Sequence, residues 1–294
     1  MKYVTFAEQG TGTPRVGVLD TEAGTVAPLP QDAVPEGLLS VVDRDVAGEP
    51  PAATLAPAPV ADVRLLAPLP RPRHDLVCVG KNYAEHASEF ARSGRDATGS
   101  GPEVPAAPIF FTKAPSTVVG PDDVVDPHLD LTDALDYEAE IAVIIGRGGR
   151  GIRPEDAMDH VWGYTLVNDI TARDLQERHK QWFLGKSLDT FCPMGPWAVT
   201  ADEVDLTETW LECRVNGELR QRACTTDMVF DVPTLVATLS AGITLAPGDV
   251  IATGTPAGVA LGFDPPRYLV PGDVVEVSAT GLGLLRNTIG EGDR

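Results

Sequence analysis

Short apolar runs separated by glycine and proline dominate the chain from Val63 onward. They occupy residues 75–80, 109–114, 140–146, 163–169, 195–201, 211–217, 249–255 and 273–279. Runs of this length bounded by turn residues are typical of β-strands, and long helical periodicity is scarce. The pattern predicts a β-rich α+β domain over residues 63–294.

The first 62 residues have a different texture. Alternating runs at 2–8 and 15–20 predict strands, residues 36–44 predict a short helix, and the prolines of 50–62 prevent long regular elements. We therefore expect a small N-terminal β-rich domain with a linker over residues 1–62. A polar stretch rich in glycine, proline and serine follows Phe90, and it predicts a mobile lid over residues 90–107.

Charge narrows the range of partners. The chain has 43 acidic and 23 basic residues and a formal net charge of -20, which argues against nucleic acid or an anionic membrane as a partner. An anionic ligand would need a local group of cations. No apolar run is long enough for a signal peptide or a membrane helix, and the four cysteines lack C-x-x-C spacing, so we expect a cytoplasmic protein with reduced thiols.

Residues 136–144, DYEAEIAVI, place two glutamates inside an apolar strand. Side chains alternate between the faces of a strand, so Glu138 and Glu140 point the same way while Ile141 and Val143 point the other way. Taken alone, this segment is more typical of a solvated strand face. Asp169 ends another apolar run, however, and three converging carboxylates indicate a site for a hard cation, Mg²⁺ or Mn²⁺.

A candidate acid–base pair lies in GKNYAEHASEF, residues 80–90. On a helix that begins near Tyr83, His86 and Glu89 are three residues apart and share a face, so the carboxylate can orient the imidazole for general-base work. By itself the pair is more typical of an exposed helix. Its place directly before the predicted lid favours a catalytic interpretation.

Cationic and amide side chains follow Asp169. Arg173 and Gln176 come four and seven residues later, so on a helix they lie on the same side as Asp169, and Lys186 follows in a loop. Such groups beside a metal suit a carboxylate or a developing oxyanion. Each taken alone, Arg173 and Lys186 are more typical of residues on the protein surface.

Several linked motifs resemble the fumarylacetoacetate hydrolase family, in particular its smaller bacterial members of the acylpyruvase and 2-hydroxyhepta-2,4-diene-1,7-dioate isomerase type. The resemblance spans residues 63–290 and rests on GKNYAEHASE, IFFTKAPSTVVGP, DYEAEIAVIIG, GYTLVNDITARDLQ, GKSLDTFCPMGP, LSAGITLAPGDVIATGTPAGV and GLGLLRNTI. It implies a mixed β-sandwich roll, a homodimer, and Mg²⁺ or Mn²⁺ as cofactor, with Ca²⁺ an expected substitute in crystals.

The resemblance also implies roles for individual residues. They are Glu138, Glu140 and Asp169 as metal ligands, His86 and Glu89 as the catalytic dyad, Lys186 as the active-site lysine, and Arg173, Gln176 and Thr255 as substrate-binding residues. Two departures from the family pattern stand out. The segment before His86 offers no fourth metal carboxylate, and Ala260 replaces the usual glycine of its loop.

The family includes more than one reaction. The substrate implied is a small anionic 2-oxo or 2,4-dioxo acid, and the complete His86 and Glu89 pair favours metal-dependent hydrolysis of a carbon–carbon bond through an enolate, because that reaction must activate water. Isomerisation of the hydroxymuconate type, tautomerisation and oxaloacetate decarboxylation are the alternatives on the same scaffold. A metal-dependent binding protein without turnover is a second alternative.

Overall fold

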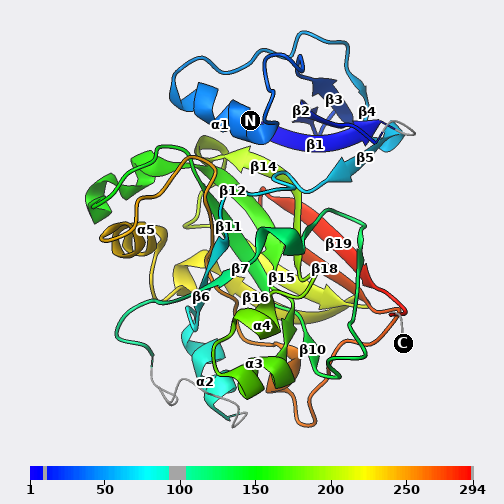
Figure 1. The fold of residues 1–294 in the computed structure, drawn as a ribbon, viewed down its shortest axis with the longest axis vertical. Coiled ribbons are helices and arrows are strands. Elements are labelled where there is room, and N and C mark those ends of the chain that lie inside the picture. Colours follow the sequence, from blue (N-terminus) through cyan, green and yellow to red (C-terminus); the bar gives the residue numbers. More distant parts are fainter. Residues whose placement is uncertain (9–11, 93–103, 293–294) are drawn as a thin grey trace.

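The computed structural model describes residues 1–8, 12–92 and 104–292. Residues 93–103, most of the predicted lid, lie outside this range, so the lid stays a prediction. Two layers of strands form the body of the molecule, and a small N-terminal part lies at one end (Figure 1). The strand-rich α+β architecture expected from the sequence is confirmed. The structure contains one chain, and the homodimer also stays a prediction.

The N-terminal strands form one edge of the main sheet. They are β1 (Lys2–Glu8), β2 (Pro14–Asp20), β3 (Thr25–Pro28), β4 (Ala58–Pro59) and β5 (Val63–Leu66). β1 pairs with β2 and β5, and also with β14 (Cys192–Thr200). The first strand after the predicted boundary at residue 62 therefore joins the N-terminal strands, and hydrogen bonds link this part to the rest of the fold. The predicted short helix is α1 (Leu38–Val46), whose buried face is Leu38, Val41 and Val42.

The central sheet continues from β14 through the remaining strands. In spatial order they are β12 (Val161–Asn168), β11 (Ala139–Ile145), β17 (Val250–Ala252), β6 (Leu76–Gly80) and β7 (Ile109–Lys113), and β8 (Val118–Val119) pairs with β14. All residues of β11 and β12 are buried, because both faces of the sheet are covered. Ile141 and Val143 pack into one apolar cluster and Ala142 and Ile144 into another, as the two-residue period of a strand requires.

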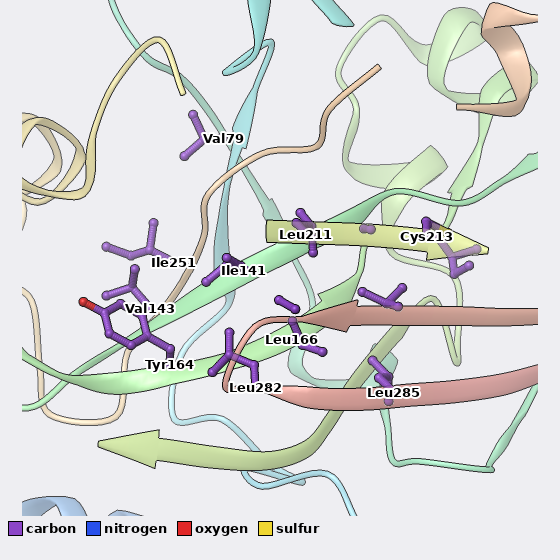
Figure 2. Close-up of a cluster of buried hydrophobic side chains, with 14 of the residues drawn as sticks. Val79, Ile141, Val143, Tyr164, Leu166, Leu211, Cys213, Ile251, Leu282 and Leu285 are labelled. Atoms are coloured by element: carbon purple, nitrogen blue, oxygen red, sulfur yellow. The ribbon is translucent and has the colours of Figure 1, made fainter. Parts of the chain in front are cut away.

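A second sheet packs against one face of the central sheet. Its strands are β16 (Glu218–Cys224), β15 (Trp210–Val215), β18 (Val274–Ala279), β19 (Gly283–Ile289) and β9 (Val124–Val125). Figure 2 shows the apolar side chains between the layers, where Leu211 and Leu285 of the second sheet face Ile141 and Leu166 of the central one. This core holds β11 rigidly, and with it the two glutamates at its beginning.

The remaining α-helices lie outside these layers. They are α2 (Ala84–Arg92), α3 (Arg173–His179), α4 (Phe183–Lys186) and α5 (Val232–Ser240). Short 3₁₀ turns occur at Val60–Asp62, Pro115–Thr117, Pro154–His160, Ala201–Glu203, Thr225–Asp227 and Ala260–Gly262. α2, α3 and α4 gather at the end of the molecule away from the N-terminal strands (Figure 1). No described helix is long and apolar enough to cross a membrane.

Candidate active site and metal centre

Three carboxylates converge where β11 begins and β12 ends. Glu138 directly precedes β11, Glu140 is its second residue, and Asp169 directly follows β12. The strands are antiparallel neighbours, with Ala139 opposite Asn168, and the Asp169 N–H donates to the Glu138 carbonyl at 2.8 Å. One oxygen of each acid lies within 4.8 Å of the others, and all three residues are buried. A solvated strand face is therefore excluded for this pair of glutamates.

Two lysines bind the triad from separate elements. Lys186, at the end of α4, donates from Nζ to Glu138 Oε2 at 2.6 Å and to Asp169 Oδ2 at 2.7 Å. Lys113, at the end of β7, donates to Asp169 Oδ1 at 2.6 Å, to the Ile170 carbonyl at 3.0 Å, and to the Lys186 carbonyl. Asp169 is thus held by a cation on each carboxylate oxygen, and Lys113 ties the backbone of Lys186 to the same place.

Arg173 links the triad to a further buried acid, Asp136. Its Nε donates to Asp136 Oδ2 at 2.8 Å, while Nη2 lies 2.6 Å from Glu138 Oε1 as an ion pair outside hydrogen-bond angles. Asp136 also accepts from the N–H groups of Ala260 at 2.7 Å and Leu261 at 3.0 Å. Arg173 is only 1% exposed, so these two carboxylates must compensate its buried positive charge.

The electrostatic balance differs between the two glutamates. Burial raises the pKa of Glu140 well above its usual range, and the Asp169 and Glu138 carboxylates raise it further. Burial acts in the same direction on Glu138, but the Lys186 ammonium and the Arg173 guanidinium outweigh it and hold the Glu138 pKa well below its usual range. The protein's own cations therefore do not fully offset the repulsion that the Asp169 and Glu138 carboxylates exert on an ionised Glu140.

The acid–base pair occupies the buried side of α2. His86 Nδ1 lies 3.3 Å from Glu89 Oε2, and the Gly258 N–H donates to both oxygens of Glu89, at 3.0 and 3.2 Å. A methyl group at Gly262 would lie 1.8 Å from Glu89 Oε1, so only glycine leaves the Glu89 carboxylate in this position. Because a carboxylate accepts, Nδ1 is the donor, and in a neutral ring the lone pair is therefore on Nε2. His86 and Glu89 are buried, contrary to the exposed-helix alternative.

The loop after β17 provides further polar groups. The Gly254 N–H donates to Glu140 Oε2 at 2.9 Å, and Thr255 Oγ1 accepts from Gln221 Nε2 at 2.8 Å. Gln221 Oε1 in turn accepts from the Ala139 N–H at 3.0 Å. The loop that contains Thr255 is therefore bonded directly to the glutamate strand.

One narrow pocket brings these groups together. It is lined by Val79, Gly80, Lys81, His86, Phe90, Phe111, Glu138, Glu140, Arg173, Gln176, Trp182, Lys186 and Thr255. Asp169 and Glu89 lie directly behind it, bonded to Lys186 and adjacent to His86. All nine residues singled out from the sequence are thus at one place in the structure, although they come from six separate segments of the chain.

Two local expectations are wrong. Asp169 does not share a helix with Arg173, because β13 (Thr171–Ala172) pairs with β10 (Leu135–Asp136) and keeps the chain extended until α3 begins. Lys186 lies at the end of α4 instead of in a loop. Lys113 and Asp136 were missed altogether. Asp136 continues the two-residue spacing of Glu138 and Glu140, a signal that could have revealed it.

The donor set fits a hard divalent cation. Three carboxylates from two neighbouring strand ends offer oxygen ligands within a small volume, and neither cysteine nor histidine belongs to the cluster. Mg²⁺, Mn²⁺ and Ca²⁺ prefer such oxygen ligands. A cation beside Glu140 would also relieve the repulsion that raises its pKa.

Two protein-family models match this chain. Residues 75–290 match the model described as fumarylacetoacetate (FAA) hydrolase C-terminal, and residues 1–68 match one described as Rv2993c-like, N-terminal. The chain belongs to the fumarylacetoacetate hydrolase family. Enzymes of this family are generally dependent on divalent metals, which agrees with the buried acidic triad.

The relatives of this chain within the family are named for different activities. Oxaloacetate tautomerase YisK of Bacillus subtilis (strain 168) is 51% identical over 232 residues, which are 79% of this chain and 74% of the relative. A fumarylacetoacetate hydrolase structure from Exiguobacterium antarcticum matches with a TM-score of 0.82 and 44% identity over 99% of each chain. A 2-hydroxyhepta-2,4-diene-1,7-dioate isomerase structure from Mycobacterium marinum matches with a TM-score of 0.76 and 32% identity, over 99% of this chain and 98% of the other.

Proposed function

We propose that this chain is a divalent-metal-dependent tautomerase of small 2-oxo diacids, with oxaloacetate as the first candidate substrate. One observation carries the proposal. A buried imidazole, His86, lines the same pocket as Glu138, Glu140 and Lys186, so a proton carrier shares the pocket with groups that stabilise an enolate. The names of the relatives, which include oxaloacetate tautomerases and a dienedioate isomerase, favour this reaction over the carbon–carbon hydrolysis first expected from the sequence.

Tautomerisation requires one proton to leave and one to arrive. In the enol-to-keto direction the C2 hydroxyl loses its proton and C3 gains one. His86 is assigned both transfers, because Glu89 holds Nδ1 and leaves Nε2 for the substrate. Nε2 takes the proton of the C2 hydroxyl, and the imidazolium so formed delivers a proton to C3. The Gly258 N–H holds both oxygens of Glu89 in turn. The imidazole is therefore oriented before the substrate arrives.

Oxygen atoms of the substrate need a different set of groups. Lys186 is assigned to the oxygen at C2, where negative charge develops. Burial would lower the pKa of Lys186, but Asp169 and Glu138 raise it above its usual value, so its ammonium persists at neutral pH. A divalent cation held by the triad would supply Lewis-acid stabilisation of the same charge. Gln176 and Thr255, which line the pocket, are assigned to the adjacent carboxylate.

A spectrophotometric assay of enol decay tests the proposal. Enol-oxaloacetate is dissolved with enzyme and Mg²⁺ or Mn²⁺, and the decay of its ultraviolet absorbance is compared with the decay after addition of EDTA. We expect metal-dependent acceleration, and we expect His86→Gln to reduce it by roughly 10²- to 10⁴-fold, the usual contribution of a general acid–base group. A matched variant, His74→Gln, changes an exposed imidazole and should have no effect.

Two side assays separate the alternatives. Release of pyruvate from oxaloacetate would indicate a decarboxylase, and release of acetate with pyruvate from acetylpyruvate would indicate a hydrolase. Either product, formed without any change in the rate of enol decay, would overturn the tautomerase proposal. Ligand-dependent stabilisation without change of any substrate would identify a binding protein.

A further inference from the structure

Lys81 is a buried lysine that the assignments above leave unused. It lies in the turn between β6 and α2, is 3% exposed, and lines the same pocket as His86 and Arg173. Its Nζ lies 5.5 Å from the centroid of the Phe90 ring, and the Arg173 guanidinium carbon lies 5.8 Å from the same centroid. Two cations thus lie near one aromatic ring at the pocket.

The turn around Lys81 is firmly held. Asn82 donates from Nδ2 to the carbonyls of Phe230 at 3.0 Å and Thr253 at 2.7 Å, and its Oδ1 accepts from the Phe230 N–H at 2.8 Å. This anchoring keeps the Lys81 backbone at a φ of 57°, a region that glycine or asparagine adopts more readily. Turn geometry alone would thus favour another residue. A strained backbone with a buried charge points to a use for the side chain.

Three other buried cations of the site contact its acids. Arg173 contacts Asp136 and Glu138, while Lys113 and Lys186 contact Asp169. These contacts neutralise the carboxylates that would bind the metal. A dianionic 2-oxo acid brings a second carboxylate, remote from its oxo group, into a protein of net charge -20. That carboxylate needs a cation at the pocket wall, outside the metal cluster.

We propose that Lys81 binds the remote carboxylate of the substrate and thereby selects dicarboxylic over monocarboxylic 2-oxo acids, an inference that rests on the proposed tautomerase function. A lysine ammonium has three donors and can bind a carboxylate alongside contacts within the protein. The Phe90 ring supports it from one side, since a cation near an aromatic face is attracted to it. Lys81 is then the residue that recognises the second charge of oxaloacetate.

The test compares oxaloacetate with its 4-monoethyl ester, which has the same enol but lacks the remote charge. In wild-type protein, kcat/KM should be higher for the diacid. Lys81→Met should lower kcat/KM for the diacid roughly 10- to 100-fold, mainly through KM, and leave the ester within about twofold, because only the diacid bonds to the ammonium. Lys81→Arg, which keeps the charge, should retain the preference.

Lys180→Met is the matched control, because Lys180 has a φ of 60° but is exposed at the end of α3. Lys180→Met should leave kcat/KM unchanged for both the diacid and the ester. Equal losses for diacid and ester in Lys81→Met, or no loss for either, would overturn the role of Lys81. If wild-type protein converts neither substrate, the tautomerase proposal fails, while calorimetric titration of the Mg²⁺-loaded variants with both compounds still decides whether Lys81 discriminates between them.

Discussion

Replacing Glu140 by glutamine should stabilise the metal-free protein and abolish its response to Mg²⁺. The substitution keeps the size of the side chain and removes one negative charge from the buried triad. The amide oxygen can still accept from the Gly254 N–H, which now donates to Glu140 Oε2 at 2.9 Å. The change is therefore almost purely electrostatic.

The magnitude follows from the separation of the ligand atoms. One oxygen of each acid lies within 4.8 Å of the others, and two unit charges at that distance repel by about 3.5 kcal/mol at an effective dielectric constant of 20. Glu140 takes part in two such pairs, and the Lys186 ammonium, which bonds both other acids, offsets roughly one of them. After the cost of burying the new amide, we expect a gain of about 2 kcal/mol and a rise in Tm of about 5 °C.

Thermal unfolding in EDTA and in Mg²⁺ measures both effects. Wild-type protein should gain about 2.7 kcal/mol when Mg²⁺ is present at 100 times its Kd, whereas Glu140→Gln should gain little, so the order of stability reverses. Glu22→Gln, at an exposed position, should behave as wild type. A variant less stable than wild type in EDTA, or one with the full Mg²⁺ response, would refute the reasoning.

The pH dependence of stability tests independently whether ionised Glu140 destabilises the metal-free protein. The pKa of Glu140 is raised in the folded state, so its ionisation costs stability at pH values above the folded pKa. As the pH falls through that pKa, the folded protein binds a proton and the cost declines, and below the ordinary glutamate pKa it is gone. The advantage of Glu140→Gln over wild type in EDTA should therefore shrink as the pH falls.

Two further substitutions test the supports of the site. Asp136→Asn should lower the free energy of unfolding by about 3–5 kcal/mol in denaturant titrations, because it leaves a buried guanidinium with one carboxylate fewer, whereas Asp133→Asn, at an exposed position nearby, should change it by less than about 0.5 kcal/mol. Gly262→Ala should displace the Glu89 carboxylate and lower kcat by roughly 10- to 100-fold with a smaller effect on KM, and unchanged kinetics would show that Glu89 does not orient the imidazole.

The parts of the site that could be predicted depend on local periodicity. Two-residue spacing placed Glu138 and Glu140 on one face, and three-residue spacing placed His86 and Glu89 on one side of a helix. These rules act within a single element, and the structure confirms the shared faces. The role of each residue stays a proposal that the variants above address.

Partners from distant segments could not be predicted in this way. Lys113 reaches Asp169 across 56 residues, and Asp136 meets the N–H groups of Ala260 and Leu261 across 124 and 125 residues. Those contacts arise because the end of β7, an edge strand, lies beside Asp169, and the turn after Val259 lies beside Asp136. The sequence around Lys113 or Asp136 does not predict these long-range contacts. A lysine is also expected on the surface unless its partners are known.

The charge of the buried cluster connects metal and substrate. The directly contacting groups comprise four acids and three bases, namely Asp136, Glu138, Glu140, Asp169, Lys113, Arg173 and Lys186. With ordinary ionisation this cluster carries one net negative charge, and a protein of net charge -20 adds to the repulsion of an anion. A bound divalent cation reverses the sign of the cluster. Because the carboxylates proposed to bind the metal are the same ones that would repel the proposed 2-oxo diacid, we expect bound metal to raise the affinity for this substrate by more than its direct contacts alone would provide.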